Sequence, residues 1–401
     1  MNILILTPRM PFPPFRGDKL KIYNIAKNLA KSNKVTILTF IQSDSELIGI
    51  HEYEKMDISV IAVKQKLWKS VLNCILLGFS GKPFQQLYYK SDAYHNQLQE
   101  LLGREKYNVI YYHLIRMAQY ELTDEYPEIC HVSDYTDAVS LYLTRLTAIE
   151  KNPIKKMLFT MESNRVRKAE VINTKFDLSY VCSDSDRQYL AQFSGHETIR
   201  ILPNGIEIQQ FSPDETVQKE DRFLFTGNMP YFPNIDAVQF FSKEIFPSLS
   251  KKYPTFKFYI VGQDPPEKIK RLSSEKIVVT GFVRDIRLEY LKSKITVAPM
   301  RFGAGTLNKI IESMALGTPV IASNQAVSGM NSDLKQFIFT ADSVDEYVKH
   351  TDYILSNYDH VLSNQKKGIQ YITNNLSWEK IVSDFENDLL LGLSRKKNKS
   401  T

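Results

Sequence analysis

A glycine-bearing loop followed by a predicted helix contains the residues of this sequence that are best suited to chemistry. The stretch from Arg301 to Ser323 reads RFGAGTLNKIIESMALGTPVIAS. Its paired glycines let a bulky anion approach the backbone, and the free amides at a helix start favour negative charge. Lys309 and Glu312 are three residues apart and share one helix face. A cation for phosphate and a carboxylate for sugar hydroxyls, both near such a helix end, suit a nucleoside diphosphate.

The same spacing also fits an ordinary surface helix with a lysine and a glutamate on its solvent side. Apolar residues at helical spacing, including Ile310, Ile311 and Met314, supply the buried side of either helix. A Gly-x-Gly pair is common in proteins. The stretch by itself therefore leaves both interpretations open.

The elements that must position this helix follow an alternating pattern along the whole chain. Short β-branched runs alternate with amphipathic stretches, which is typical of α/β units with parallel sheets. Strands are predicted at 3–6, 35–40, 58–63, 109–112, 129–132, 178–181 and 198–202, then at 223–226, 257–261, 277–280, 295–298, 319–322 and 337–339. Helices are predicted at 19–30, 235–251, 286–292 and 306–316, and from 344 to the end.

This rhythm is interrupted once, near the middle of the chain. Pro203, Asn204 and Gly205 are followed by a polar, acidic run that ends at Asp221, and such a run marks a domain boundary. We predict one domain over residues 1–205, a second over 206–375 and a terminal segment over 376–401. Two successive doubly wound domains would enclose a cleft, and ligands of such sheets bind beyond the carboxyl ends of the strands.

Composition excludes several classes of protein. A length of 401 residues suits two or three domains. The net charge is +6, but four of the lysines and arginines lie in the last seven residues. The remainder lacks the concentrated basic face that nucleic acid requires. Cys74, Cys130 and Cys182 are too far apart for a metal knuckle. The start of the chain lacks the long apolar core of a signal peptide, so we expect a cytoplasmic protein.

Several motifs resemble those of GT-B glycosyltransferases of the large family-4 type, the glycosyl transferases group 1. From Phe223 to Ser323 the sequence is similar to their carboxy-terminal domain. The motifs that carry this resemblance are FTGNMPYFPNIDAV at 225–238, FYIVG at 258–262, VTGFVRD at 279–285 and ESMALGTPV at 312–320. ILPNGIE at 201–207 matches the interdomain segment, and LSWEK at 376–380 matches a closing helix that crosses back to the first domain. PFPPFRGDKL at 11–20 resembles the branch associated with bacterial exopolysaccharide clusters.

The resemblance implies the GT-B fold, an α/β architecture of two doubly wound Rossmann-like domains facing each other across a cleft. It also implies roles for single residues. Glu312 matches the glutamate that binds the ribose hydroxyls of a nucleotide-sugar. The loop facing the donor sugar and diphosphate comprises Gly303, Ala304, Gly305 and Thr306, and the segment where the base docks comprises Gly281, Phe282 and Val283.

Two further matches lie in the first domain. Gly17 lies in a glycine loop that faces the donor phosphate in the family. His113 matches a histidine that lines the sugar site in many relatives. A neutral histidine there can hydrogen-bond a sugar hydroxyl without adding charge, whereas a satisfied histidine at a strand end is the plainer alternative.

Two departures from the family pattern affect the expected chemistry. Ala304 stands where the family usually has a second glutamate that holds the donor sugar, and Asn228 stands where it often has an arginine. A departing diphosphate needs cations in a low-dielectric site. We therefore expect Lys309 and Arg301 to replace the missing charges and, with His113, to be the catalytic candidates.

Metal chemistry is not expected. Asp184 and Asp186 form a D-x-D pattern, but they follow a predicted strand and precede a helix, so helix capping is the better interpretation. No other cluster of histidines and carboxylates has the spacing of a metal site. We expect neither a metal nor a cofactor, with the nucleotide-sugar acting as a substrate.

Two basic segments of the first domain suggest contact with a membrane. Residues 64–69 (KQKLWK) lead into the apolar run 71–77, and residues 151–168 place six basic residues around Met157, Leu158 and Phe159. Cations near an anionic leaflet contribute ~1 kcal/mol each. Ordinary amphipathic helices packed on the sheet are the alternative.

These observations predict a glycosyltransferase that moves a sugar from a UDP- or GDP-linked donor to an acceptor hydroxyl of a cell-surface glycan or glycolipid precursor. The family implies retention of anomeric configuration without metal. Ala304 and Asn228 keep open a catalytically silent nucleotide-sugar-binding subunit of another transferase. A sugar-nucleotide epimerase on the same architecture is the third alternative, and it would need a pair of acid/base carboxylates that the sequence does not provide.

Overall fold

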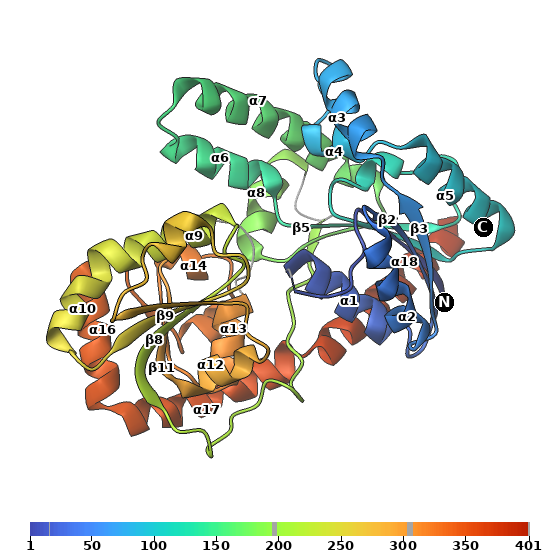
Figure 1. The fold of residues 1–401 in the computed structure, drawn as a ribbon. Helices are drawn as coiled ribbons and strands as arrows, with labels where there is room; N and C mark the ends of the chain where they lie inside the picture. Colours follow the sequence, from blue (N-terminus) through green and yellow to red (C-terminus); the bar gives the residue numbers. More distant parts are fainter. Residues whose placement is uncertain (16, 195–198, 303–307, 400–401) are drawn as a thin grey trace. The chain divides into compact units, whose positions relative to one another are not determined.

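The chain forms two compact units in the computed structural model, which describes residues 1–15, 17–194, 199–302 and 308–399 (Figure 1). Unit 1 comprises Met1–Pro203 and Trp378–Thr401, and unit 2 comprises Asn204–Ser377. The last helix of the chain therefore belongs to the same unit as the first strand.

Unit 1 contains a parallel sheet of seven strands in the order β3-β2-β1-β4-β5-β6-β7. The strands are β1 Asn2–Thr7, β2 Lys34–Ile41, β3 Ile58–Lys64, β4 Val109–His113, β5 Cys130–Thr136, β6 Leu178–Val181 and β7 Ile199–Ile201. The strand order reverses between β1 and β4, the position at which doubly wound sheets bind ligands beyond their carboxyl ends.

Helices cover both faces of this sheet. They are α1 Gly17–Leu29, α2 Ile48–Glu54, α3 Leu67–Leu76, α4 Phe84–Tyr88, α5 Asp92–Arg104, α6 Val139–Ile149, α7 Pro153–Glu170, α8 Asp184–Ser194 and α18 Trp378–Lys399. Helices α1 and α18 bury Ile25 and Phe385 against one face, and α5 buries Leu98 against the other. Burial on both faces explains the near-continuous apolar runs of these strands.

Unit 2 contains a parallel sheet of six strands in the order β10-β9-β8-β11-β12-β13. The strands are β8 Glu220–Thr226, β9 Lys257–Val261, β10 Ile277–Gly281, β11 Ser293–Ala298, β12 Val320–Ala322 and β13 Phe339–Thr340. The helices are α9 Phe232–Phe240, α10 Phe246–Lys252, α11 Glu267–Lys270, α12 Ile286–Lys292, α13 Asn308–Ala315, α14 Asn324–Val327, α15 Ser332–Lys335, α16 Val344–Ser356 and α17 Tyr358–Asn375.

Each of the predicted strands is present, and the predicted α/β fold with two Rossmann-like sheets is confirmed. One helix differs from the prediction. The segment expected as a single helix at 235–251 is divided by a π-helical turn, Phe241–Ile245, between α9 and α10. Pro247 lacks the amide hydrogen that a regular helix needs at this point, and a wider turn accommodates the loss.

Candidate functional site

The predicted lysine lies buried at the carboxyl edge of the second sheet. Lys309 is the second residue of α13, which follows β11, and only 7% of its surface is exposed. Its ammonium donates to Asn234 Oδ1 at 2.9 Å and lies 3.7 Å from the centroid of the Phe225 ring. Burial lowers the pKa of Lys309 to about 7, against the opposing charge of Glu312. An anion bound here would restore the full charge of the lysine.

Amide side chains continue from Lys309 across the ends of β8 and β9. Asn234 donates through Nδ2 to the carbonyl of Asn228 at 2.9 Å, and Gln263 Nε2 lies 3.4 Å from Asn228 Oδ1. Asn234 therefore links Lys309 to Asn228. Sequence reasoning did not select Asn234 or Gln263, although Asn234 stands within the motif at 225–238.

Two glycines let these strand ends come together. A Cβ atom on Gly262 would lie 1.8 Å from the carbonyl oxygen of Gly227, and one on Gly227 would lie 2.7 Å from Asn234 Nδ2. A side chain at either position would therefore displace backbone or the asparagine that holds Lys309.

The predicted ribose-binding glutamate is fixed by a tyrosine. Glu312 is half-buried, and its Oε2 accepts a hydrogen bond from Tyr290 Oη at 2.8 Å. The same hydroxyl lies 2.5 Å from Thr226 Oγ1, at the end of β8. Burial raises the pKa of Glu312, while Tyr290 and Lys309 act in the opposite direction. Tyr290 of α12 thus orients the carboxylate, a role that sequence analysis missed.

Removing this hydroxyl tests the orienting role. If Glu312 binds the ribose of a nucleotide, as the resemblance implies, Tyr290→Phe should weaken binding of that nucleotide about three- to tenfold, because part of the roughly 1.5–3 kcal/mol of a hydrogen bond to a charged group is lost. The same substitution in a Glu312→Ala background should weaken binding no further, since the two residues act as one unit. Calorimetric titration of both variants measures this coupling. Additive losses would assign Tyr290 a purely structural role.

In the structure, Arg301 is paired with a carboxylate of α9. Its guanidinium pairs with Asp236 of α9, with Nε 2.8 Å from Oδ2 and a second contact to Oδ1. It also stacks over the Phe240 ring at 5.0 Å. Since sequence spacing could not reveal Asp236 as a partner, Arg301 was expected to be available for the diphosphate.

The segment that is expected to contact the nucleotide base forms a turn at the end of β10. Gly281 has a φ of +72°, which strongly favours glycine, and its carbonyl accepts from Gly262 N at 3.1 Å. Phe282 is 59% exposed, and Val283 packs against the cluster around Tyr290. This turn leaves an aromatic ring at the strand edge. Gly303, Ala304, Gly305 and Thr306 lie outside the described residues.

The two predicted residues of unit 1 lie at the strand-order reversal of its own sheet. His113 ends β4 and is 2% exposed, with Nε2 3.2 Å from the carbonyl of Asp18. Gly17 precedes Asp18 as the exposed first residue of α1, where an added Cβ atom would meet nothing within 4 Å. The structure therefore brings His113 next to the start of α1. Its burial also fits the plainer interpretation of a histidine satisfied within unit 1.

A buried ion pair supports His113 and was not predicted. Asp134, near the end of β5, lies 3.0 Å from Lys21 Nζ, and both side chains are fully buried. His113 Nδ1 lies 3.7 Å from Asp134. Although burial favours the protonated acid, Lys21 and His113 hold the pKa of Asp134 below its usual range. Lys21 stands beside the apolar stripe of a helix, a position that sequence patterns assign to solvent.

The D-x-D pattern lies in the first turn of α8, as a helix-start interpretation requires. The capping group is Ser183, whose Oγ accepts from Asp186 N at 3.2 Å. Asp137, Cys182 and Asp186 bring potential ligand atoms within 4.8 Å of one another in the described part of the chain. Cys182 Sγ donates to Asp137 at 3.2 Å, and the amide of Ala138 donates to Asp186 at 3.2 Å. Protein hydrogen bonds therefore already occupy this group.

A buried glutamate next to this group makes the stability of the protein depend on pH. Glu170 is fully buried and accepts hydrogen bonds from Ser140 N and Oγ. Burial raises the pKa of Glu170 to about 7, despite these bonds. The folded protein therefore holds this proton more tightly than the unfolded chain. Stability from Glu170 should be complete below about pH 4.5 and lost by about pH 7, on the order of 3 kcal/mol.

Urea unfolding at a series of pH values checks this expectation. Glu170→Gln keeps a carbonyl acceptor for Ser140 and removes the titrating group. The variant should lose the part of the decline that Glu170 causes, whereas burial and the charge of Asp186 also raise the pKa of Asp137 to about 7 and leave a second part. An unchanged slope in Glu170→Gln would show that another group causes the decline.

Comparisons with known proteins agree with this geometry. Residues 220–357 match the family model described as Glycosyl transferases group 1. No curated protein sequence matches the chain. The family model covers β8 to α16, which includes Asn228, Lys309 and Glu312.

Solved structures share the fold over nearly the whole chain. Anabaena Alr3699/HepE, solved with UDP and glucose, has a TM-score of 0.68 at 14% identity, covering 97% of this chain and 99% of that one. Sucrose-phosphate synthase from Thermosynechococcus elongatus has a TM-score of 0.70 at 13% identity over all of both chains. WaaG, a glycosyltransferase involved in lipopolysaccharide biosynthesis, has a TM-score of 0.60 at 12% identity over 96% and 99%.

The chain has the two-sheet GT-B fold of these solved structures, and residues 220–357 of its second unit match the glycosyl transferases group 1 model. A bilayer-spanning helix needs about 20 apolar residues in succession, and none of the helices in the described ranges meets that requirement.

Proposed function

We propose that this protein transfers a sugar from a UDP-linked donor to an acceptor hydroxyl, and that unit 2 binds the donor. The observation that carries the proposal is the pair formed by Lys309 and Glu312, one helix turn apart at the carboxyl edge of the second sheet. The group 1 match includes both residues. The similar HepE structures contain UDP or UDP-glucose, which favours uridine over guanosine.

The residues of this site suggest how each part of the donor is handled. Glu312 would accept hydrogen bonds from the ribose hydroxyls, oriented by Tyr290. Lys309 would become fully charged against the diphosphate and stabilise it as the sugar departs. The exposed backbone around Gly281 would contact the base. In unit 1, His113 is our candidate for a hydrogen bond to a sugar hydroxyl.

A protein ammonium at the diphosphate makes a metal unnecessary for charge neutralisation, so we propose a metal-independent reaction. Retention of anomeric configuration follows the resemblance to family-4 enzymes. Arg301, which is paired with Asp236, would assist as a second cation.

We propose a glycan or lipid-linked precursor of the cell surface as the acceptor, formed at the inner face of the membrane. The similarity of fold to WaaG and the sequence at 11–20, which resembles the exopolysaccharide branch, support this class.

A silent nucleotide-sugar-binding subunit is the second candidate. It is favoured by Asn228, which stands at the family's arginine position, and by the engagement of Arg301 with Asp236. Such a subunit would bind the donor and release no nucleotide.

Turnover separates the two candidates. Incubation of the protein with radiolabelled UDP-sugars, bacterial lipid extract and EDTA should release UDP and label the lipid or glycan fraction. Product NMR would then report the anomeric configuration. Binding of UDP-sugars without any release of UDP, with or without extract, would support the silent subunit instead.

A further inference from the structure

Helix α3 of unit 1 turns its apolar side chains outward. They form adjacent pairs that repeat every four residues, and each is between 41% and 68% exposed: Leu67 and Trp68, Val71 and Leu72, Ile75 and Leu76. Phe79, just beyond the helix, is 98% exposed. An amphipathic helix on a sheet normally presents such a stripe to the core. The interpretation of α3 as an ordinary packed helix therefore does not hold for this stripe.

A second outward-facing stripe lies on α7. Its side chains Ile154, Met157, Leu158 and Met161 follow helical spacing and are 36–66% exposed. The two helices lie at the same end of unit 1 (Figure 1). Arg165 of α7 donates to the carbonyl of Gly78 at 2.6 Å, and Glu162 accepts from Phe84 N at 2.7 Å. These bonds fix α7 to the segment that follows α3, so the stripes belong to one surface.

The charges around both stripes are mainly positive, although Lys64 pairs with Asp44, and Glu150 and Glu162 flank the second segment. Residues 64–82 contain four lysines and no acidic residue, and residues 151–161 contain three lysines and no acidic residue. Lysines at the edge of an apolar face are attracted to anionic lipid headgroups while the apolar side chains enter the acyl boundary. A second copy of the same surface would instead bring lysines against lysines, because a symmetric contact pairs a patch with itself.

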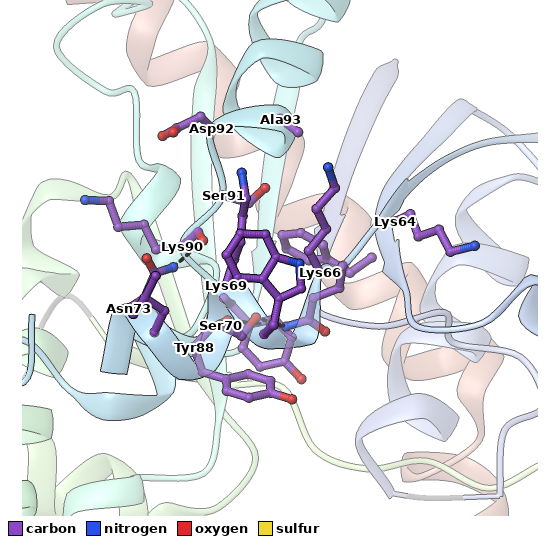
Figure 2. A pocket seen from close by; sticks show the side chains of 15 residues that line it. Lys64, Lys66, Lys69, Ser70, Asn73, Tyr88, Lys90, Ser91, Asp92 and Ala93 are labelled. Atoms are coloured by element: carbon purple, nitrogen blue, oxygen red, sulfur yellow. Dashed lines mark hydrogen bonds between the residues drawn. The ribbon is translucent and has the colours of Figure 1, made fainter. Parts of the chain in front are cut away.

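A pocket of about 370 Å³ lies directly beside α3. Its lining includes the four lysines Lys64, Lys66, Lys69 and Lys90, with one acidic residue, Asp92. Lys64 and Lys90 lie on opposite sides of it, and Asn73 donates to the backbone of Lys90 (Figure 2). Trp68 also lines the pocket, with Lys69 Nζ 5.5 Å from its ring. Cations around an aromatic ring suit a phosphate-bearing headgroup whose glycerol and upper chains need an apolar wall.

We infer that the outward faces of α3 and α7 dock onto an anionic lipid surface, and that the pocket beside α3 receives a phosphate-bearing lipid headgroup. This inference rests on the proposed location of the acceptor at the membrane, and it names the surface of unit 1 that would contact the lipid. Docking depends only on unit 1 residues that take no part in donor binding, so its failure would leave the proposed transfer untouched.

Sedimentation of the full-length protein with lipid vesicles tests the inference. The protein should bind vesicles of phosphatidylcholine with phosphatidylglycerol at least tenfold more tightly than pure phosphatidylcholine vesicles. Lys66→Glu with Lys69→Glu should reduce binding to the anionic vesicles at least tenfold, because each lysine near the surface strengthens binding about fivefold. Lys366→Glu with Lys367→Glu, an equal charge change on two exposed lysines of α17 in unit 2, should not.

A second pair of variants tests how much the apolar side chains contribute to vesicle binding. Ile75→Gln with Leu76→Gln should also reduce binding at least tenfold, whereas Leu390→Gln with Leu391→Gln, on exposed leucines of α18, should leave it unchanged. Unchanged circular dichroism and an unchanged thermal unfolding curve would show that each variant is folded. Absence of wild-type binding, equal binding to both vesicle types, or equal effects of test and control variants would overturn the inference.

Discussion

Replacing Lys309 by methionine should lower the rate of sugar transfer from a UDP-sugar at least ~100-fold. Removing one preorganised donor to a developing anion typically costs 10²–10³ in rate. Lys309 is the cation that the structure holds nearest to Glu312 on α13, and its burial excludes water that would weaken its field. Methionine has a similar length and suits the apolar contact with Phe225, so the fold should persist. Steady-state UDP release measures the effect.

The same lysine should make donor binding depend on pH. The pKa of Lys309 is about 7 because the residue is buried, and a bound diphosphate favours its charged form. Affinity for UDP-glucose should therefore be highest below about pH 7 and fall as the pH rises. Binding near neutral pH should also take up protons, which calorimetry in buffers of different ionisation enthalpy detects. Lys309→Met should abolish both effects.

A half-buried lysine of unit 2 provides a control. Lys219 stands just before β8, at the opposite end of the strand, and donates to Ser293 O at 3.0 Å and Thr318 Oγ1 at 2.9 Å. Burial lowers the pKa of Lys219 to about 8. Lys219→Met should change stability without changing transfer or its pH dependence. Equal losses in both variants would show that Lys309 acts through stability alone.

Replacing Glu312 by alanine should weaken UDP binding at least tenfold. A hydrogen bond to a charged group contributes roughly 1.5–3 kcal/mol, and tenfold corresponds to about 1.4 kcal/mol. The carboxylate is already oriented by Tyr290 at 2.8 Å, so little ordering is needed when ribose binds. The rate of sugar transfer at saturating donor should change much less than the apparent affinity for the donor. The lost contacts are to ribose and not to the reacting atoms.

Glu275→Ala is the control for this substitution. Glu275 is an exposed glutamate of the same unit, and its loss removes the same charge at a distance from α13. This variant should bind UDP normally. Near-normal binding by Glu312→Ala itself would remove the ribose role.

The strands and most helices could be predicted because their signals are local. Buried parallel strands appear as β-branched runs, and the pattern from β8 to β12 also carries the motifs that place Lys309 and Glu312. The ends of α13 could be predicted from the glycine-bearing loop before the helix and the glycine after it. Secondary structure and the placement of Lys309 and Glu312 on one helix were therefore accessible from sequence.

Side-chain partners were not accessible, because they join distant parts of the chain. Lys309 and Asn234 are 75 residues apart, and Arg301 and Asp236 are 65 apart. No periodicity shows which carboxylate will meet which cation after folding. The same limit hid Lys21 and Asp134, which are 113 residues apart. Arg301 was consequently expected to be available, and Tyr290 was not expected at all.

The central claim is that unit 2 binds a uridine diphosphate without metal at the edge that holds Lys309 and Glu312. Calorimetric titration of the full-length protein with UDP and with GDP, first in EDTA and then with Mg²⁺, tests it most directly. We predict saturable binding of UDP in EDTA that Mg²⁺ leaves unchanged, and little binding of GDP. Absence of UDP binding to the folded protein, or binding that appears only with Mg²⁺, would contradict the account.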